Sequence, residues 1–119
     1  MLDPETARAL WFSEIEDGAF TAFYRRLVPE SPGVLNDYSG GNVGVTRARI
    51  TCPILVIGAE FDRTPVHHAP AIAAFYGCDC IVVAGAAHNL MMESASLPVA
   101  IRINEWLLRH IDGPALPRP

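Results

Sequence analysis

The sequence has no cluster of basic residues and no hydrophobic run long enough to cross a membrane. Its 119 residues contain 9 Lys plus Arg and 13 Asp plus Glu, which gives a formal net charge of −4. This balance disfavours nucleic acid and anionic membranes as partners. A membrane-spanning helix needs about 20 apolar residues in succession. The first five residues also lack the basic and apolar parts of a signal peptide, so we expect a one-domain cytoplasmic protein.

The cysteines and histidines do not have the spacing of a metal site. The sequence has three cysteines, an odd number, and we interpret Cys52, Cys78 and Cys80 as reduced thiols. Cys78 and Cys80 are too closely spaced for an ordinary zinc half-site, and no second half-site follows. His67 and His68 are adjacent, so on a helix they point about 100° apart and do not readily share an ion. We therefore expect neither a metal nor another cofactor.

The most informative stretch runs from Thr51 to Leu90. Two apolar, β-branched runs, Cys52–Gly58 and Cys80–Gly85, flank a segment at 67–77 that is typical of a helix. We expect Ile72, Phe75 and Tyr76 to form the buried side of that helix. Such continuous runs predict parallel strands that are buried on both faces. Asp62 follows the first run and His88 follows the second. Because the carboxyl ends of parallel strands meet at one edge of a sheet, we expect these two residues to lie close together, where open α/β sheets place their sites.

The remaining sequence predicts helices on both sides of this unit. Asp3-Pro4-Glu5 begins a helix that we expect to reach Ile15, followed by a second helix over 19–27. Ser31-Pro32 begins a short third helix ending at Ser39, with Gly40 as the residue after its C-cap. A final helix is predicted over 97–110, with Ala100, Ile103, Trp106, Leu107 and Ile111 facing the sheet. We divide the chain into a helical cap-like segment (1–45), a β-α-β-α unit (46–112) and a flexible tail (113–119).

Several motifs in the β-α-β-α unit resemble the C-terminal part of the α/β-hydrolase family. They are P-I-L-V-I-G-A-E-F-D ending at Asp62, the following Pro65, and V-V-A-G-A-A-H ending at His88 with an apolar patch after it. The resemblance implies a partial α/β-hydrolase fold, with cap-like helices before the last two core strands. It further implies that Asp62 is the acid and His88 the base of a Ser-His-Asp triad.

The nucleophile motif of that family, G-x-S-x-G, does not occur in the sequence. The nearest string is Asp37-Tyr38-Ser39-Gly40-Gly41, which lacks the first glycine and the preceding apolar strand. We interpret Ser39 as a helix end and Glu60, the nearest substitute acid, as solvated. By resemblance the complete system is a serine hydrolase of ester or amide bonds in small apolar substrates. We expect the chain to be inactive alone, and the sequence leaves open whether it is an enzyme.

A two-stranded sheet leaves unpaired backbone groups at its edges and is not stable by itself. An N-terminal hydrolase fragment that covers the open edge is one solution. Self-association, as a homodimeric binding or interaction module without catalysis, is another. A third alternative is an enzyme that uses Asp62 and His88 for proton abstraction without a covalent step.

Six aromatic residues in the first segment favour core packing over a substrate pocket: Trp11, Phe12, Phe20, Phe23, Tyr24 and Tyr38.

Overall fold

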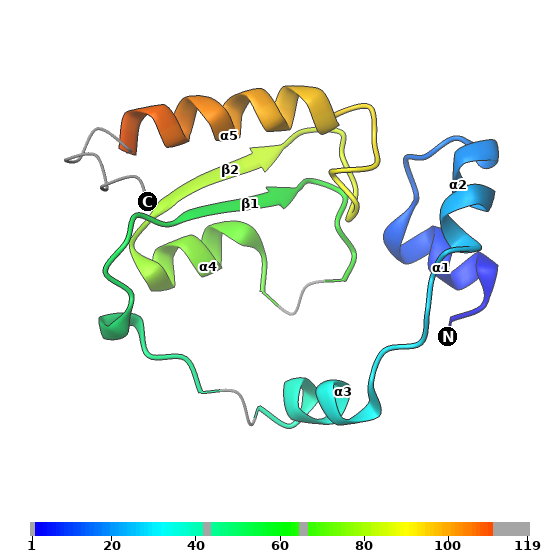
Figure 1. Ribbon diagram of the computed structural model, residues 1–119, viewed down its shortest axis with the longest axis horizontal. Helices are drawn as coiled ribbons and strands as arrows, with labels where there is room; N and C mark the ends of the chain where they lie inside the picture. Colours follow the sequence, from blue (N-terminus) through cyan, green and yellow to red (C-terminus); the bar gives the residue numbers. More distant parts are fainter. Residues whose placement is uncertain (1, 42–43, 65–66, 111–119) are drawn as a thin grey trace, which may run out of the picture.

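The computed structural model describes residues 2–41, 44–64 and 67–110 and has the mixed α/β character that the sequence predicts (Figure 1). Pro65, Ile111 and the tail 113–119 lie outside the described residues. The elements in chain order are the helices α1 (Pro4–Trp11), α2 (Asp17–Tyr24) and α3 (Pro32–Ser39), the 3-10 helix η1 (Arg47–Arg49), the strand β1 (Leu55–Ala59), the helix α4 (Ala69–Tyr76), the strand β2 (Asp79–Val83) and the helix α5 (Ser96–His110).

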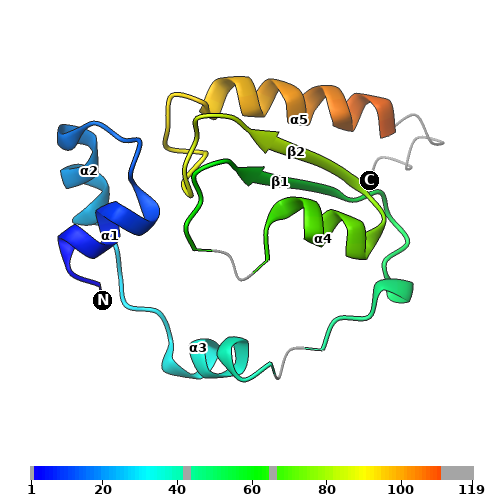
Figure 2. The same ribbon diagram turned by 180° about the vertical axis from the view of Figure 1, so that it is seen from behind.

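The two strands form a parallel sheet between two helices. Leu55 of β1 pairs with Asp79 of β2, and the register continues to Ala59 and Val83. One face packs against α5, where Val83 and Val99 form a buried cluster with Ala86. The other face carries α4, so close that a Cβ on Gly58 would lie 2.5 Å from the Cβ of Ala69. Figures 1 and 2 show α5, the sheet and α4 as three layers.

The strands are shorter and more exposed than expected. β1 begins at Leu55 rather than Cys52, and β2 ends at Val83 rather than Gly85, whose φ of +70° turns the chain out of the strand. Burial on both faces was the wrong expectation, because all five residues of β1 are partly exposed and Val82 is 46% exposed. The physical reason is the size of the sheet, since two strands and one helix per face cannot enclose a strand.

The covering helices also differ from expectation in which residues they bury. α4 covers Ala69–Tyr76 rather than 67–77, and it buries Ala73 while the aromatic Phe75 is 57% exposed. α5 begins at Ser96, one residue earlier than expected, and buries Val99 and Trp106, with Ile103 packed beside them. We expected Ala100 and Leu107 to face the sheet as well, but both are exposed, so this part of the prediction was wrong. Each helix meets only two strands, so a narrow stripe is enough to cover them.

The first two helices form a separate small cluster around Phe12. This ring is 2% exposed and lies 5.7 Å from Phe20 and 6.3 Å from Phe23, measured between ring centroids. α1 ends at Trp11 rather than Ile15, because Arg8 donates a hydrogen bond to the Ile15 carbonyl and holds the chain folded back. α2 begins at Asp17, two residues earlier than the expected Ala19, and ends at Tyr24 rather than Leu27.

The segment between this cluster and β1 contributes no buried residue among those described. Every described residue from Val28 to Pro53 is exposed, including the whole of α3. α3 ends at Ser39 as expected, but Gly40 is its C-cap in right-handed conformation, and Gly41 takes the left-handed φ of +66°. The predicted boundary at residue 45 falls within this exposed stretch and stays a prediction. The three cysteines are free, and Cys52 and Cys80 are exposed.

Candidate active site

Beyond the ends of the strands, the segments that carry Asp62 and His88 continue side by side. The Glu60 N–H donates to the Val83 carbonyl at 3.0 Å, and the Phe61 N–H donates to the Ala86 carbonyl at 2.8 Å. These two hydrogen bonds continue the pairing of the two segments beyond the ends of β1 and β2. They bring the loop that follows β1 next to the loop that leads to His88.

Asp62 is fixed by a turn with Thr64. The Thr64 N–H and hydroxyl both donate to Asp62 Oδ1, at 2.9 and 2.8 Å. Aspartate commonly closes a turn in this way with the backbone two residues on. The turn leaves Asp62 Oδ2 available for a different partner.

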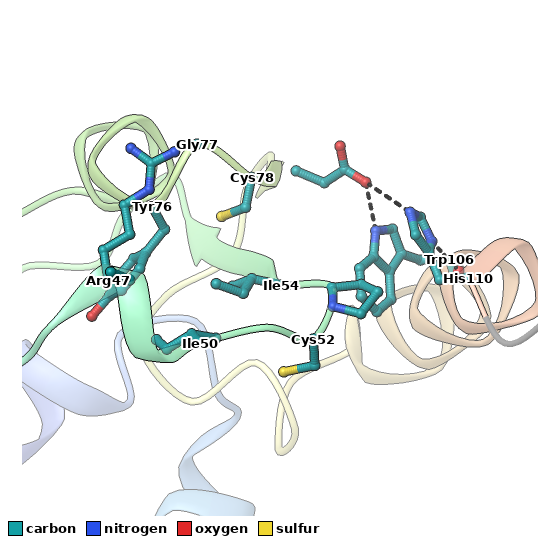
Figure 3. A pocket seen from close by; sticks show the side chains of 12 residues that line it. Arg47, Ile50, Cys52, Ile54, Tyr76, Gly77, Cys78, Trp106 and His110 are labelled. Atoms are coloured by element: carbon teal, nitrogen blue, oxygen red, sulfur yellow. Dashed lines mark hydrogen bonds and ion pairs between the residues drawn. The ribbon is translucent and has the colours of Figure 1, made fainter. Parts of the chain in front are cut away.

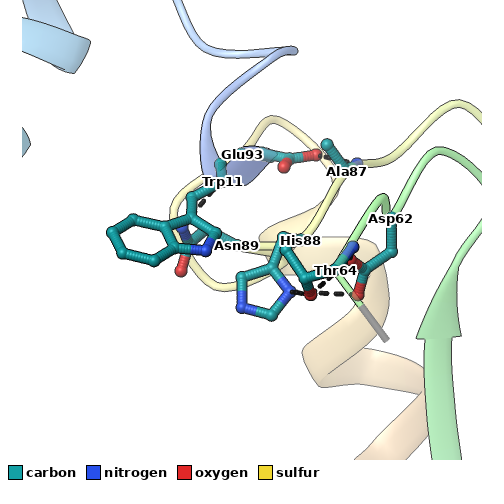
Figure 4. A network of polar contacts seen from close by, with 7 residues as sticks. All are labelled: Trp11, Asp62, Thr64, Ala87, His88, Asn89 and Glu93. Carbon is teal, nitrogen blue, oxygen red and sulfur yellow. Dashed lines mark hydrogen bonds and ion pairs between the residues drawn. The ribbon is translucent and has the colours of Figure 1, made fainter. Parts of the chain in front are cut away.

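His88 provides that partner. Its Nδ1 atom lies 3.0 Å from Asp62 Oδ2 and 2.9 Å from Thr64 Oγ1 (Figure 4). The single hydroxyl proton of Thr64 goes to the Asp62 carboxylate, so the hydroxyl oxygen and the carboxylate both face Nδ1 as acceptors. Nδ1 therefore carries the proton and Nε2 is the basic nitrogen of the neutral ring. No described residue forms a hydrogen bond with Nε2, which points away from Asp62 in Figure 4.

The environment of Asp62 favours its charged form. Partial burial raises the pKa of the carboxyl group, but the hydrogen bonds from the Thr64 backbone, the His88 ring and the Thr64 hydroxyl, together with the charge of His88, outweigh this effect. The net result is a pKa below the ordinary value for aspartate. At neutral pH Asp62 is thus a carboxylate, and the His88 side chain beside it is 39% exposed.

Three further contacts hold the loop that carries His88. Glu60 Oε2 accepts the Gly85 N–H at 2.8 Å, so this exposed acid is hydrogen-bonded as well as solvated. Glu93 Oε2 accepts the buried Ala87 N–H at 2.8 Å. The Asn89 side chain donates to the Trp11 carbonyl at 2.8 Å, which joins the loop to the end of α1. The loop is therefore anchored before and after His88.

Sequence reasoning identified Asp62 and His88 but missed Thr64, Glu93 and Asn89. For Thr64 a signal existed, since an aspartate followed two residues later by threonine is typical of a side-chain-closed turn. Glu93 and Asn89 give no such signal, because their partners are backbone groups that only the folded loop brings near. We expected the two site residues to lie together, and the 3.0 Å distance agrees with this; their catalytic role stays a prediction.

A groove adjoins Asp62 along β1 and the start of α4. Its volume is about 370 Å³, and its walls include residues 56–60 of β1 and the turn after it, His67, His68 and Ile72. No described residue of α1, α2 or α3 lines it, so the cap-like helices do not close this groove within the described part of the chain. The described residues, which include His67 and His68, contain no group of three His, Cys, Asp or Glu side chains that could hold a metal ion.

A second aspartate and histidine lie at the amino end of β2. Trp106 Nε1 donates to Asp79 Oδ2 at 2.6 Å, and His110 Nε2 lies 3.8 Å from the same oxygen. These side chains line an open cavity of about 690 Å³, together with Arg47, Cys52 and Cys78 among others (Figure 3). His110 Nδ1 is 2.8 Å from the Trp106 carbonyl, so the ring is bound within its own helix. This pair was not among the predicted site residues.

Comparison with known proteins adds no relative. No protein-family model matches the chain, and neither a curated protein nor a solved structure matches it. In the described part of the chain, no helix combines the length and the apolarity that a membrane crossing requires. The α/β-hydrolase resemblance therefore depends on the sequence motifs, and any role for the site must be argued from its own geometry.

Proposed function

We propose that this chain is the acid–base half of a serine hydrolase of the α/β-hydrolase type. The observation that carries the proposal is the bond between Asp62 Oδ2 and His88 Nδ1, which leaves Nε2 without a partner among the described residues. A general base needs this arrangement, because the carboxylate holds the ring in one tautomer and stabilises the imidazolium that forms. Asp62 is the orienting acid and His88 the base, and Thr64 holds Asp62.

In this role His88 Nε2 takes the proton of a serine hydroxyl as its oxygen attacks the carbonyl carbon of an ester or amide. The imidazolium then returns the proton to the leaving alcohol or amine, and an acyl-serine remains. Water attacks the acyl-serine by the same route and restores the serine. The small apolar substrate expected from the resemblance stays part of the proposal. Serine and oxyanion hole come from residues that this chain does not contain.

The unpaired edge of β1 favours a partner that supplies these residues. β2 is the sole described strand that pairs with β1, so the backbone groups on the other edge of β1 have no strand partner among the described residues. The groove of about 370 Å³ lies along the same strand and reaches Asp62. We propose that an N-terminal hydrolase segment adds its strands at this edge. The added strand would form hydrogen bonds with the unpaired backbone N–H and C=O groups of β1, and its chain would place the nucleophilic serine next to His88.

The test begins with the coding sequence immediately upstream of the Met1 codon. We expect an in-frame G-x-S-x-G about 100 residues earlier, after an apolar run. The joined polypeptide should react with a fluorophosphonate probe and hydrolyse p-nitrophenyl esters, and His88→Ala should abolish both, while His110→Ala should retain them. The proposal is wrong if no such motif is encoded there, or if His88→Ala leaves the joined protein fully active.

Self-association as a binding module is the second candidate. It is favoured by exposed apolar residues on the outer side of α5, where Leu97 is 68%, Ile101 50% and Leu108 61% exposed. Pairs of such faces can form a dimer interface. Sedimentation and urea unfolding separate the candidates. A compact dimer with one cooperative transition favours the module, whereas a folded monomer whose free energy of unfolding rises when the upstream segment is joined to it favours the hydrolase.

A further inference from the structure

Among the described residues, Glu93 is the sole charged residue that is buried, with 5% of its surface exposed. It follows the proposed base by five positions and lies beside Ala87 in Figure 4. Its Oε2 atom accepts the Ala87 N–H at 2.8 Å. Its Oε1 atom is buried and has no hydrogen-bond partner within the part of the chain that the structure describes.

This environment is unfavourable for a residue that serves stability alone. Removing a carboxylate from water is costly, and an oxygen left without a donor adds to that cost. An apolar side chain of similar volume avoids both penalties, although it leaves the Ala87 N–H unpaired. Among the described residues, the Glu93 side chain has one hydrogen-bond partner, the Ala87 N–H. That bond holds the residue directly before His88.

We propose that Glu93 is a positioning residue for His88, an inference that rests on the proposed function. Ala86 and Ala87 are 1% and 0% exposed, and they are held from two sides. The Phe61 N–H, next to Asp62, bonds the Ala86 carbonyl, and Glu93 bonds the Ala87 N–H. The two bonds fix the backbone from which the imidazole projects towards Asp62. Water cannot replace Glu93 at a fully buried N–H, so the loss of its carboxylate shifts this backbone.

The experiment measures the tautomer of His88 in the full chain. In histidine labelled with nitrogen-15, the two ring nitrogens report which of them carries the proton. At a pH above neutrality we expect most wild-type molecules to carry the proton on Nδ1. In Asp62→Asn this preference should be lost, because the hydrogen bond from Nδ1 to the Asp62 carboxylate sets the tautomer. Glu93→Leu should shift the ratio to that of Asp62→Asn, and Glu93→Asp, which withdraws the carboxylate, should shift it in the same direction.

Two control variants separate positioning from folding. Glu93→Gln keeps an oxygen that can accept the Ala87 N–H, so it should retain the wild-type tautomer. Glu60→Leu removes a bond of the same length, 2.8 Å, from the exposed Gly85 N–H, where water can substitute, and it should also retain that tautomer. Backbone amide spectra establish that each variant is folded, and Glu93→Asp keeps the test decisive if Glu93→Leu unfolds.

The outcomes distinguish this inference from the proposed function. If Asp62→Asn shifts the tautomer but Glu93→Leu and Glu93→Asp do not, Glu93 has no positioning role and the acid–base pair stands. If Asp62→Asn leaves the tautomer unchanged, the pair itself is not coupled and the proposed function fails. If both Glu60→Leu and Glu93→Leu lose the preference for the Nδ1–H form, the specific role of Glu93 is also overturned. Any weakening of the loop would then have the same effect.

Discussion

Two aspartate–histidine pairs lie at opposite ends of the same sheet, and they differ in what the protein leaves free. At the carboxyl end, His88 binds Asp62 through Nδ1 at 3.0 Å, and its Nε2 has no described partner. At the amino end, His110 faces Asp79 through Nε2 at 3.8 Å, and its Nδ1 binds the carbonyl of Trp106. Only the first arrangement provides a basic nitrogen for a substrate or nucleophile. The presence of an acid near a histidine is thus a weaker sign of function than the nitrogen left available.

The aspartates differ in the same sense. Among the described residues, the Asp62 carboxylate accepts hydrogen bonds from Thr64 and His88 alone, both within the candidate site. Asp79 is already bound at 2.6 Å by the indole of Trp106, a residue of the core. The amino-end pair therefore contributes to the docking of α5 on the sheet. The comparison leads to four predictions, three of which set one end of the sheet against the other.

The largest expected effect concerns acyl transfer. We predict that the pure 119-residue chain hydrolyses p-nitrophenyl esters no faster than background. The loss of the nucleophile from such a relay costs on the order of 10⁶ in kcat. His88→Ala and His110→Ala should be indistinguishable from the wild-type chain in this assay. Turnover that disappears in His88→Ala but persists in His110→Ala would show that the chain is an enzyme by itself.

The second prediction compares stability at the two ends. Trp106→Ala removes a buried ring and the bond to Asp79, so we expect a loss of about 3–5 kcal/mol in the free energy of unfolding. His88→Ala removes a side chain that is 39% exposed and should cost less than about 1 kcal/mol. Urea unfolding followed by circular dichroism measures both. Equal losses would mean that the carboxyl-end pair is also a structural contact.

The third prediction uses the low pKa of Asp62. A carboxyl group whose pKa is lower in the folded state adds stability above its unfolded pKa of about 3.9, and this contribution is lost as pH falls through the folded pKa. Thr64→Ala removes two of the bonds that stabilise the charged form. It should cost about 1–2 kcal/mol at neutral pH and less in acid.

Thr64→Ser, which retains the hydroxyl, is the matched control and should behave like the wild-type chain. The measurement is the free energy of unfolding between pH 2 and 7, at intervals of about half a pH unit. Asp3 also has a lowered pKa, because of its bonds to the backbone and hydroxyl of Thr6, so every variant keeps that part of the acid response. A Thr64→Ala chain with the same loss of stability at all pH values would contradict the assignment to Asp62.

The smallest expected effect concerns two glycines with positive φ. Gly85 precedes the His88 loop with a φ of +70°, and no described residue lies within 4 Å of an added Cβ. Gly85→Ala should therefore cost only the backbone strain, about 1 kcal/mol. Gly77 ends α4 with a φ of +65°, and a Cβ there would also meet the Arg47 guanidinium, whose flexible side chain can move away. Thermal unfolding should show similar losses, and a much larger one at Gly85 would reveal an unrecognised close contact.

Several elements of the fold followed from local sequence signals. Asp3 caps α1 through the Thr6 N–H, as its position before Pro4 predicts, and Gly77 ends α4 in the left-handed conformation. The parallel pairing of the strands followed from two apolar runs separated by a helix. The positions of Asp62 and His88 followed from the ends of those runs. Each of these signals involves neighbours in the chain or one strand crossover.

Burial was predicted less well. Apolar residues such as Phe75, Val82 and Leu107 were expected to be covered, yet they are 57%, 46% and 39% exposed. Their hydrophobicity indicates what a side chain favours, but the number of elements packed around it determines whether it is covered. With two strands in the sheet, these side chains have no layer to contact among the described residues.

By itself, the sequence determined which aspartate and which histidine follow the two strands and which segments become helices or strands, because capping, turn and apolar patterns act over a few residues. It also determined that a nucleophile motif does not occur between Met1 and Pro119. The tertiary structure alone decided that Nδ1 of His88 faces Asp62 and Thr64, that Glu93 is buried against Ala87, and that His110 is bound to its own helix. These contacts join residues that the chain separates and only folding brings together, at distances that no local pattern specifies.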